Sequence, residues 1–110
     1  MTDGVIIATP HYFHPIIATD AFSAHQHVLS EKPAGVDTGT VREINEAAEK
    51  SGRIFGIMFN QRTDPLFAKA REILQTGQLG IPKRLVWIVT NWYRTQAYYD
   101  SGKWRATWGG

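Results

Sequence analysis

The segment His27-Val28-Leu29-Ser30-Glu31-Lys32-Pro33 joins a short apolar run to a charged turn. The run is too short for a helix and its apolar side chains are adjacent, so it predicts a strand buried on both faces. The proline marks the point where the chain leaves that strand. The segment therefore predicts a strand of a parallel sheet that ends in an acid, a base and a proline.

The same alternation continues on both sides of this segment. Upstream, an apolar run at 5–8 is followed by helically spaced apolar residues from 15 to 24. Downstream, a helix that Asp37 or Thr38 caps is followed by Gly52 and a third apolar run at 54–59. The order β-α-β-α-β predicts an α/β fold with a parallel sheet, right-handed crossovers and helices on both faces.

The pattern changes after the third run. Asp64-Pro65 is a typical start of a helix, and residues 83–93 alternate as a strand with two apolar faces. We therefore divide the chain into residues 1–62 and residues 63–110.

The composition excludes several classes of protein. The chain has 110 residues, of which 43% are hydrophobic and 20% charged, which is typical of a globular protein. No apolar run approaches the ~18 residues of a membrane span, and the first ten residues lack the features of a signal peptide. Cysteine is absent, which excludes disulfides and thiol nucleophiles and agrees with a cytoplasmic protein. The net charge of +2 is weak evidence for a polyanionic partner.

Three polar loops follow the three predicted strands. Because the carboxyl ends of parallel strands share one edge of a sheet, where ligands of open α/β sheets bind, we expect a site there. Each loop also has a plainer interpretation, as an ordinary turn, a solvated ion pair or an interdomain linker. The candidate residues are Thr9, Pro10, His11 and His14, then Glu31, Lys32 and Pro33, then Asn60, Gln61 and Arg62.

The chemistry of this edge is most specific at Lys32. Its ammonium group could polarise a hydroxyl or carbonyl group or transfer a proton, and Glu31 could orient it. The bond before Pro33 is a candidate cis bond, which would fix the Lys32 backbone. The four histidines form two pairs in the sequence, His11 with His14 and His25 with His27. Neither pair has a third ligand at a suitable spacing, so we expect no metal.

The last thirty residues mix basic and aromatic side chains, Tyr93, Trp104 and Arg105 among them, and they include the amide Asn91. Such residues pack on sugar rings or nicotinamide and bind phosphate or carboxylate groups. The same mixture suits single-stranded nucleic acid, and it would also serve the core of a small second domain.

Together these segments resemble the Gfo/Idh/MocA family, the glucose–fructose oxidoreductase and inositol dehydrogenase group. The His-Val-Leu strand followed by Glu31-Lys32-Pro33 is the most specific mark. The other shared segments are Asp3–Pro10 with His14, Phe59–Pro65, Gly77–Gly80 and Trp104–Trp108.

The resemblance implies an NAD(P)-dependent dehydrogenase that acts on a sugar, a polyol or a derivative by hydride transfer, usually as a homo-oligomer. Residues 1–62 would be the second half of a Rossmann-type sheet, and residues 63–110 the start of an α/β C-terminal domain. Lys32 would be catalytic and would contact the substrate hydroxyl group. The implied cofactor-binding residues are Thr9, Pro10, His11, His14, Glu31, Lys32, Pro33, Asn60, Trp104 and Arg105, and the substrate-binding residues are Lys32, Gln61, Arg62, Asn91 and Tyr93.

The chain also departs from the family pattern. The glycine-rich phosphate loop Gly-x-Gly-x-x-Gly is absent, and the family's Asp-x-x-x-His pair would follow Gly109-Gly110. We therefore interpret the chain as an internal fragment that is inactive alone. The alternative is a non-enzymatic module that binds sugar or nucleic acid through its basic aromatic stretch, although we do not expect nucleic acid as the partner.

Overall fold

The computed structural model describes residues 2–102 and 104–107. Trp108, Gly109 and Gly110, which the sequence analysis used, lie outside the described residues. The chain divides into two compact units, Met1–Ala68 and Lys69–Gly110, and each is described by itself.

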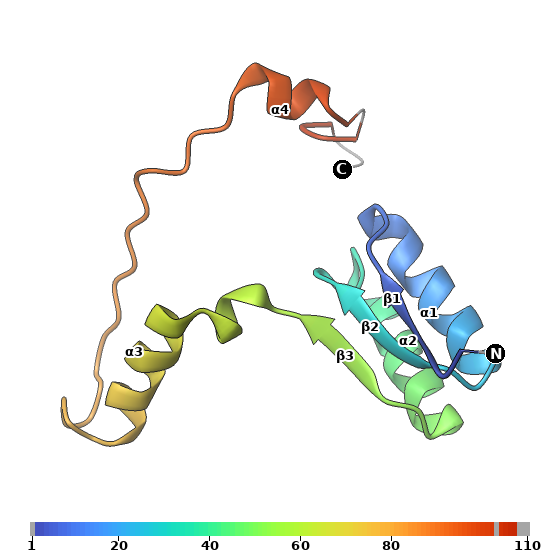
Figure 1. Ribbon diagram of the computed structural model, residues 1–110, viewed down its shortest axis with the longest axis horizontal. Helices are drawn as coiled ribbons and strands as arrows, with labels where there is room; N and C mark the ends of the chain where they lie inside the picture. Colours follow the sequence, from blue (N-terminus) through green and yellow to red (C-terminus); the bar gives the residue numbers. More distant parts are fainter. Residues whose placement is uncertain (1, 103, 108–110) are drawn as a thin grey trace. The chain divides into compact units, whose positions relative to one another are not determined.

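The first unit contains a three-stranded parallel sheet. Its strands are β1 (Gly4–Ile7), β2 (His27–Glu31) and β3 (Phe55–Met58), in the order β1-β2-β3 (Figure 1). Ile7 is in register with Ser30, and Glu31 is in register with Met58. The predicted β-α-β-α-β order is confirmed.

Two helices connect the strands and build the core. They are α1 (His14–Ser23) and α2 (Thr38–Ser51). Phe22 of α1 meets Phe55 edge to face with ring centroids 5.7 Å apart, and Ile44 of α2 is 1% exposed. The core forms between the helices and one face of the sheet and consists of Ile7, Ala18, Ala21, Phe22, Val28, Ile44 and Ala48.

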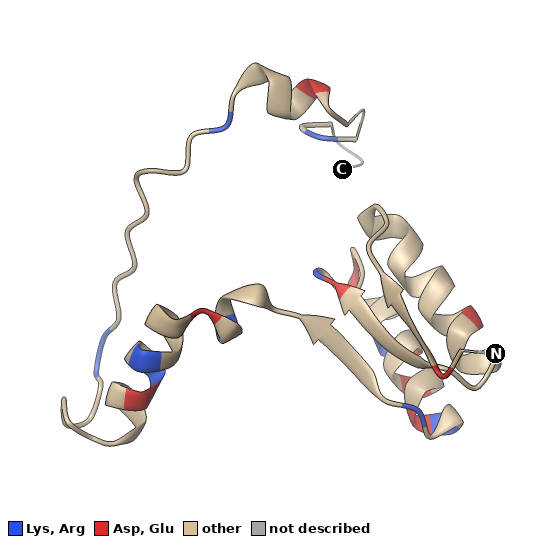
Figure 2. Ribbon diagram, viewed as in Figure 1, with Lys and Arg blue, Asp and Glu red and all other residues tan. Residues whose placement is uncertain are grey.

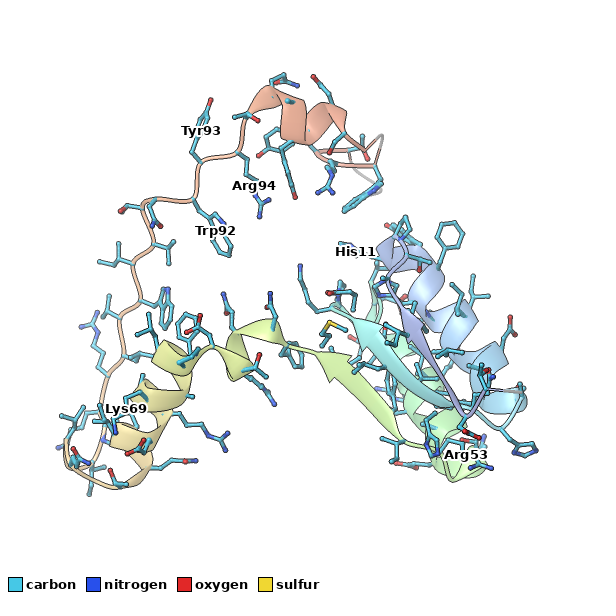
Figure 3. All side chains as sticks on the ribbon, viewed as in Figure 1. His11, Arg53, Lys69, Trp92, Tyr93 and Arg94 are labelled. Atoms are coloured by element: carbon cyan, nitrogen blue, oxygen red, sulfur yellow. The ribbon has the colours of Figure 1, made fainter. Side chains whose placement is uncertain are left out.

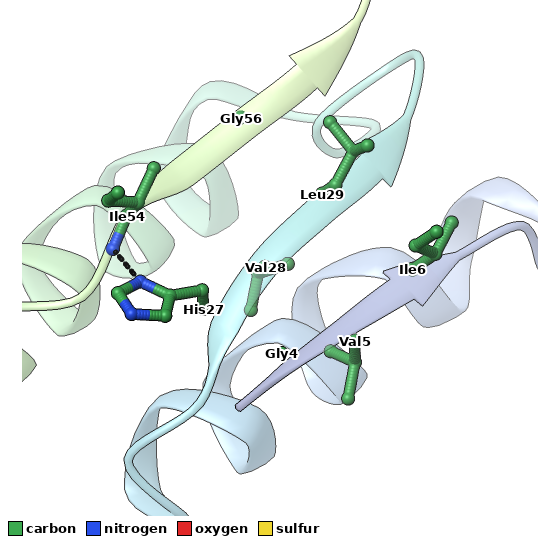
Figure 4. Close-up of a pocket in the computed structure, with 8 residues that line it drawn as sticks. All are labelled: Gly4, Val5, Ile6, His27, Val28, Leu29, Ile54 and Gly56. Atoms are coloured by element: carbon green, nitrogen blue, oxygen red, sulfur yellow. Dashed lines mark hydrogen bonds between the residues drawn. The ribbon is translucent and has the colours of Figure 1, made fainter. Parts of the chain in front are cut away.

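The opposite face of the sheet is open among the described residues. Ile6 is 71% exposed and Ile54 70% exposed, and they border a shallow hollow of about 310 Å³ (Figure 4). The prediction that helices cover both faces is therefore met on one face only. The reason is topological, since two right-handed crossovers that advance in the same direction place both helices on the same side.

The ends of α2 follow from single residues. Asp37 caps its first turn, because its carboxylate accepts the backbone N–H of Thr40 at 2.9 Å. Gly52 ends the helix with φ of 65°, a left-handed conformation that glycine adopts at little cost.

Helix α3 (Pro65–Gln75) begins where the sequence predicts, with the carboxylate of Asp64 accepting the N–H of Leu66 at 2.8 Å. The predicted strand at 83–93 is wrong. This segment is an extended connection, with Leu85 78% exposed and Ile88 79% exposed. A strand needs a neighbour for its backbone hydrogen bonds, and no described residue supplies one here. The short helix α4 (Gln96–Asp100) follows.

Charged residues lie almost entirely in helices and loops. The three strands contain one charged residue, Glu31 at the carboxyl end of β2 (Figure 2). Within the described part of the chain, every helix is too short or too polar to cross a membrane.

Candidate functional site

The three polar loops follow the three parallel strands at one edge of the sheet. Because β2 is the middle strand, the loop Glu31-Lys32-Pro33 comes between the other two. The first loop runs from Thr9 through the short 3-10 helix η1 (His11–Phe13). The third loop contains the 3-10 helix η2 (Asn60–Thr63). The topology thus brings the loops with the ten candidates of the first unit to one edge.

The middle loop fixes the backbone of Lys32 and leaves its side chain exposed. The backbone N–H of Lys32 donates to Oε2 of Glu31 at 3.2 Å, so Glu31 orients the backbone of Lys32. The buried hydroxyl group of Ser30 donates to the carbonyl oxygen of Glu31 at 3.0 Å. The Lys32–Pro33 peptide bond is cis.

His14 connects the first loop to the middle loop. Its side chain is 1% exposed, with Nδ1 2.7 Å from the carbonyl oxygen of Pro33 and Nε2 2.7 Å from the carbonyl oxygen of Thr9. The ring of His11 meets it edge-on with centroids 5.8 Å apart. Both nitrogens of His14 are therefore engaged by the chain itself.

The remaining candidates of the first unit lie on its surface. Thr9 and Pro10 are exposed, and Figure 3 places His11 at the amino-terminal end of α1. Asn60, Gln61 and Arg62 are exposed on η2. The guanidinium group of Arg62 lies 4.8 Å from the ring centroid of Phe59, beside an open hollow of about 410 Å³.

The other four candidates belong to the second unit. Asn91 and Tyr93 are exposed on the extended connection, and Figure 3 shows Trp92 and Arg94 on one side of it and Tyr93 on the other. The guanidinium groups of Arg94 and Arg105 lie 4.3 Å and 4.2 Å from the ring centroid of Tyr98. Trp104 lies under Arg105 at 4.7 Å, which completes a local cation–π cluster.

Sequence reasoning missed the roles of Ser30 and of the carbonyl groups at Thr9 and Pro33. A signal for the burial of His14 was present, since His14, Ala18 and Ala21 recur on one helical face. Among the described residues, no group of three or more His, Asp or Glu side chains is placed to hold a metal ion.

The family profile of the Gfo/Idh/MocA oxidoreductases, described as an oxidoreductase family with an NAD-binding Rossmann fold, matches residues 1–59. The chain belongs to this family. The match covers the whole sheet and the first two loops, and it ends just before the third loop, residues 60–62.

Relatives and solved structures agree with this assignment. The uncharacterized oxidoreductase YrbE of Bacillus subtilis is 31% identical over 76% of this chain and 24% of its own length. Myo-inositol 2-dehydrogenase from Lactobacillus plantarum superposes with a TM-score of 0.69 at 31% identity, over 73% of this chain and 24% of that one. The chain thus spans about a quarter of the proteins it matches.

One solved structure resembles nearly the whole chain. The WlbA dehydrogenase from Chromobacterium violaceum, solved with NADH and UDP-GlcNAcA, covers 98% of this chain and 31% of its own, with a TM-score of 0.81 at 26% identity.

Proposed function

We propose that this chain is part of an NAD(P)-dependent dehydrogenase that oxidises a hydroxyl group of a sugar, a polyol or a derivative. The observation that carries the proposal is the position of Lys32, exposed on the middle loop of the ligand-binding edge. Family membership supports the cofactor, and the inositol and nucleotide-sugar compounds named for two relatives support the substrate class.

The nicotinamide cofactor, when bound, accepts the hydride from the substrate carbon. Thr9 and Pro10, which are exposed, and His11, which is partly buried, would line the cofactor together with Glu31 to Pro33 and Asn60. We propose Trp104 and Arg105 as further cofactor-binding residues, and Gln61, Arg62, Asn91 and Tyr93 as substrate-binding residues. The sequence contains no glycine-rich phosphate loop, so these residues would serve the nicotinamide side.

Lys32 would act on the oxygen atom from which the proton leaves. Its ammonium group would donate a hydrogen bond to that oxygen and stabilise the negative charge that develops there as the hydroxyl proton passes to water, before the carbon gives up hydride. The Glu31 carboxylate holds the backbone of Lys32, so the ammonium group extends from a fixed point.

The test is Lys32→Met in the whole protein. We expect kcat to fall by about 10²- to 10³-fold, because the interaction is made mainly in the transition state, while the affinity for NAD(H) changes little. Lys69→Met is the matched control, since Lys69 is an exposed lysine on α3 and pairs with Glu72 at 2.7 Å. Near-normal turnover of Lys32→Met would remove Lys32 from the reaction.

The alternative of a non-enzymatic module remains a separate prediction. Binding of an oligonucleotide that weakens steeply with salt would favour it. We further propose that the whole protein is a cytoplasmic homo-oligomer, which the absence of cysteine and the family resemblance support.

A further inference from the structure

His14 lies buried between two carbonyl oxygens at the candidate site. Its Nδ1 is 2.7 Å from the carbonyl oxygen of Pro33 and its Nε2 2.7 Å from that of Thr9. The two carbonyl groups belong to different loops, which follow β1 and β2. One imidazole ring therefore spans the two loops.

The chemistry of the two contacts decides the protonation state of the ring. A carbonyl oxygen only accepts hydrogen bonds, and a neutral imidazole ring donates from one nitrogen and accepts at the other. A neutral ring would therefore direct a nitrogen lone pair at a carbonyl oxygen 2.7 Å away. An imidazolium ring donates from both nitrogens, so it supplies a donor to each of the two carbonyl oxygens.

We propose that His14 is a positioning residue, held as an imidazolium, that fixes the loop at Thr9 to the loop at Lys32-Pro33. Its importance for catalysis rests on the proposed function of Lys32, but the clamp itself does not. The carbonyl group of Pro33 follows the Lys32 backbone by one residue, so the clamp sets the position of Lys32 relative to the first loop.

Apart from the two carbonyl oxygens, the surroundings of the ring do not favour a positive charge. The groups nearby that can carry charge are His11, whose ring centroid lies 5.8 Å away, and Glu31 and Lys32 on the middle loop. The amino-terminal end of α1 disfavours a cation, so the two carbonyl oxygens must supply the stabilisation. The segment after the middle loop also approaches the first turn of α1, since a Cβ atom on Gly35 would lie 3.3 Å from Cγ of Pro15.

The decisive measurement is the nitrogen NMR spectrum of the histidine rings in the ¹⁵N,¹³C-labelled 110-residue chain at neutral pH. We expect both His14 nitrogens to carry slowly exchanging protons, with couplings across the hydrogen bonds to the carbonyl carbons of Thr9 and Pro33. His27 is an internal control, because its Nδ1 accepts the N–H of Ile54 at 3.0 Å and must be unprotonated (Figure 4). An unprotonated nitrogen on His14 would overturn the proposal.

Variants test the positioning role. His14→Gln retains one donor group, so the backbone amide signals of both loops should move, near Thr9 and near Pro33. His25→Asn is the control, since His25 is exposed with φ of 58°, a conformation that asparagine tolerates. Changes confined to one loop would contradict the clamp. If His14→Gln does not fold, the labelled unmodified chain still decides.

In the whole protein, His14→Gln should lower kcat by about 10- to 100-fold, with a smaller change in the KM for NAD(H), because it misplaces Lys32. An unchanged kcat would contradict the positioning role. The two proposals fail separately. If Lys32→Met retains turnover while both His14 nitrogens are protonated, the proposed function is wrong and the clamp stands.

Discussion

Asp37 shows how one carboxylate fixes the start of a helix and makes stability depend on pH. Its Oδ1 accepts the backbone N–H of Thr40 at 2.9 Å, and its Oδ2 accepts the Thr40 hydroxyl at 2.8 Å. The backbone hydrogen bond from Thr40, followed by that from its hydroxyl group, lowers the pKa of Asp37 below the ordinary 3.8. A pKa lower in the folded than in the unfolded chain stabilises the fold above 3.8, and this contribution is lost as the pH falls through the folded pKa.

We therefore expect the melting temperature of the unmodified chain to fall more steeply below about pH 4 than that of Asp37→Asn, which keeps an acceptor without the charge. Asp37→Ala should melt at a lower temperature at neutral pH as well, since it removes the cap. Calorimetric melts at a series of pH values make the comparison. Parallel pH profiles for the unmodified chain and Asp37→Asn would contradict it.

Single residues also show how far the sequence predicts the site. The loops around Lys32 could be placed at one sheet edge because strand direction follows from the β-α-β order. The hydrogen bonds of His14 could not be predicted, because its partners are backbone carbonyl groups. Every residue has such a group, so the sequence does not show which ones His14 contacts. The sequence does predict that His14 is buried, because it shares a helical face with Ala18 and Ala21.

Helix α2 is held to the first unit by its apolar face. Ile44 is 1% exposed at its centre, so Ile44→Ala should destabilise the chain by about 2–5 kcal/mol through lost burial and a cavity. Urea unfolding followed by circular dichroism measures the difference. Because this loss could unfold a small unit entirely, Ile44→Val provides a graded step of about 0.5–1.5 kcal/mol. Ile16→Ala, at a site 60% exposed on α1 and away from the open face, is the control and should cost much less.

The elements differ in how well local sequence predicts them. Helices α2 and α3 begin at the capping carboxylates of Asp37 and Asp64, and the strands β2 and β3 lie between helices. The segment 83–93 has an equally clear strand pattern, but its structure depends on a partner that the pattern does not specify. Apolar alternation predicts that a segment is suited to a sheet, and hydrogen-bonding neighbours decide whether a strand forms.

The whole chain lacks the usual device for holding a dinucleotide. Pyrophosphate groups in Rossmann folds bind to the N–H groups of a glycine-rich turn, and the 110 residues contain no Gly-x-Gly-x-x-Gly motif. We expect calorimetry to detect no NAD(H) binding to the isolated chain tighter than the millimolar range. Micromolar affinity would show that the loops at the sheet edge suffice for binding, and would contradict this prediction.

The open sheet face should govern how the isolated chain behaves in solution. Ile6, Leu29 and Ile54 are 71%, 38% and 70% exposed there, and no acidic residue, lysine or arginine lines the hollow between them. Among the described residues, the outer edge of β1 pairs with no strand, and unpaired edges recruit other chains. At about 25 cal/mol per Å², burying a few hundred Å² of this face would contribute several kcal/mol, comparable with the stability of a small domain.

We therefore expect the 110-residue chain to form dimers or larger assemblies at micromolar concentration in a sedimentation experiment. The double variant Ile6→Lys with Ile54→Lys should shift it toward the monomer, because two ammonium groups cannot be buried against a second apolar face without a large desolvation cost. Ile16→Lys is the matched control, since Ile16 is 60% exposed on α1 and lies away from the open face. If the unmodified chain is a monomer that unfolds cooperatively, the exposed face is tolerated in water. The edge of β1 and the open face would then contribute less to association than their apolar area implies.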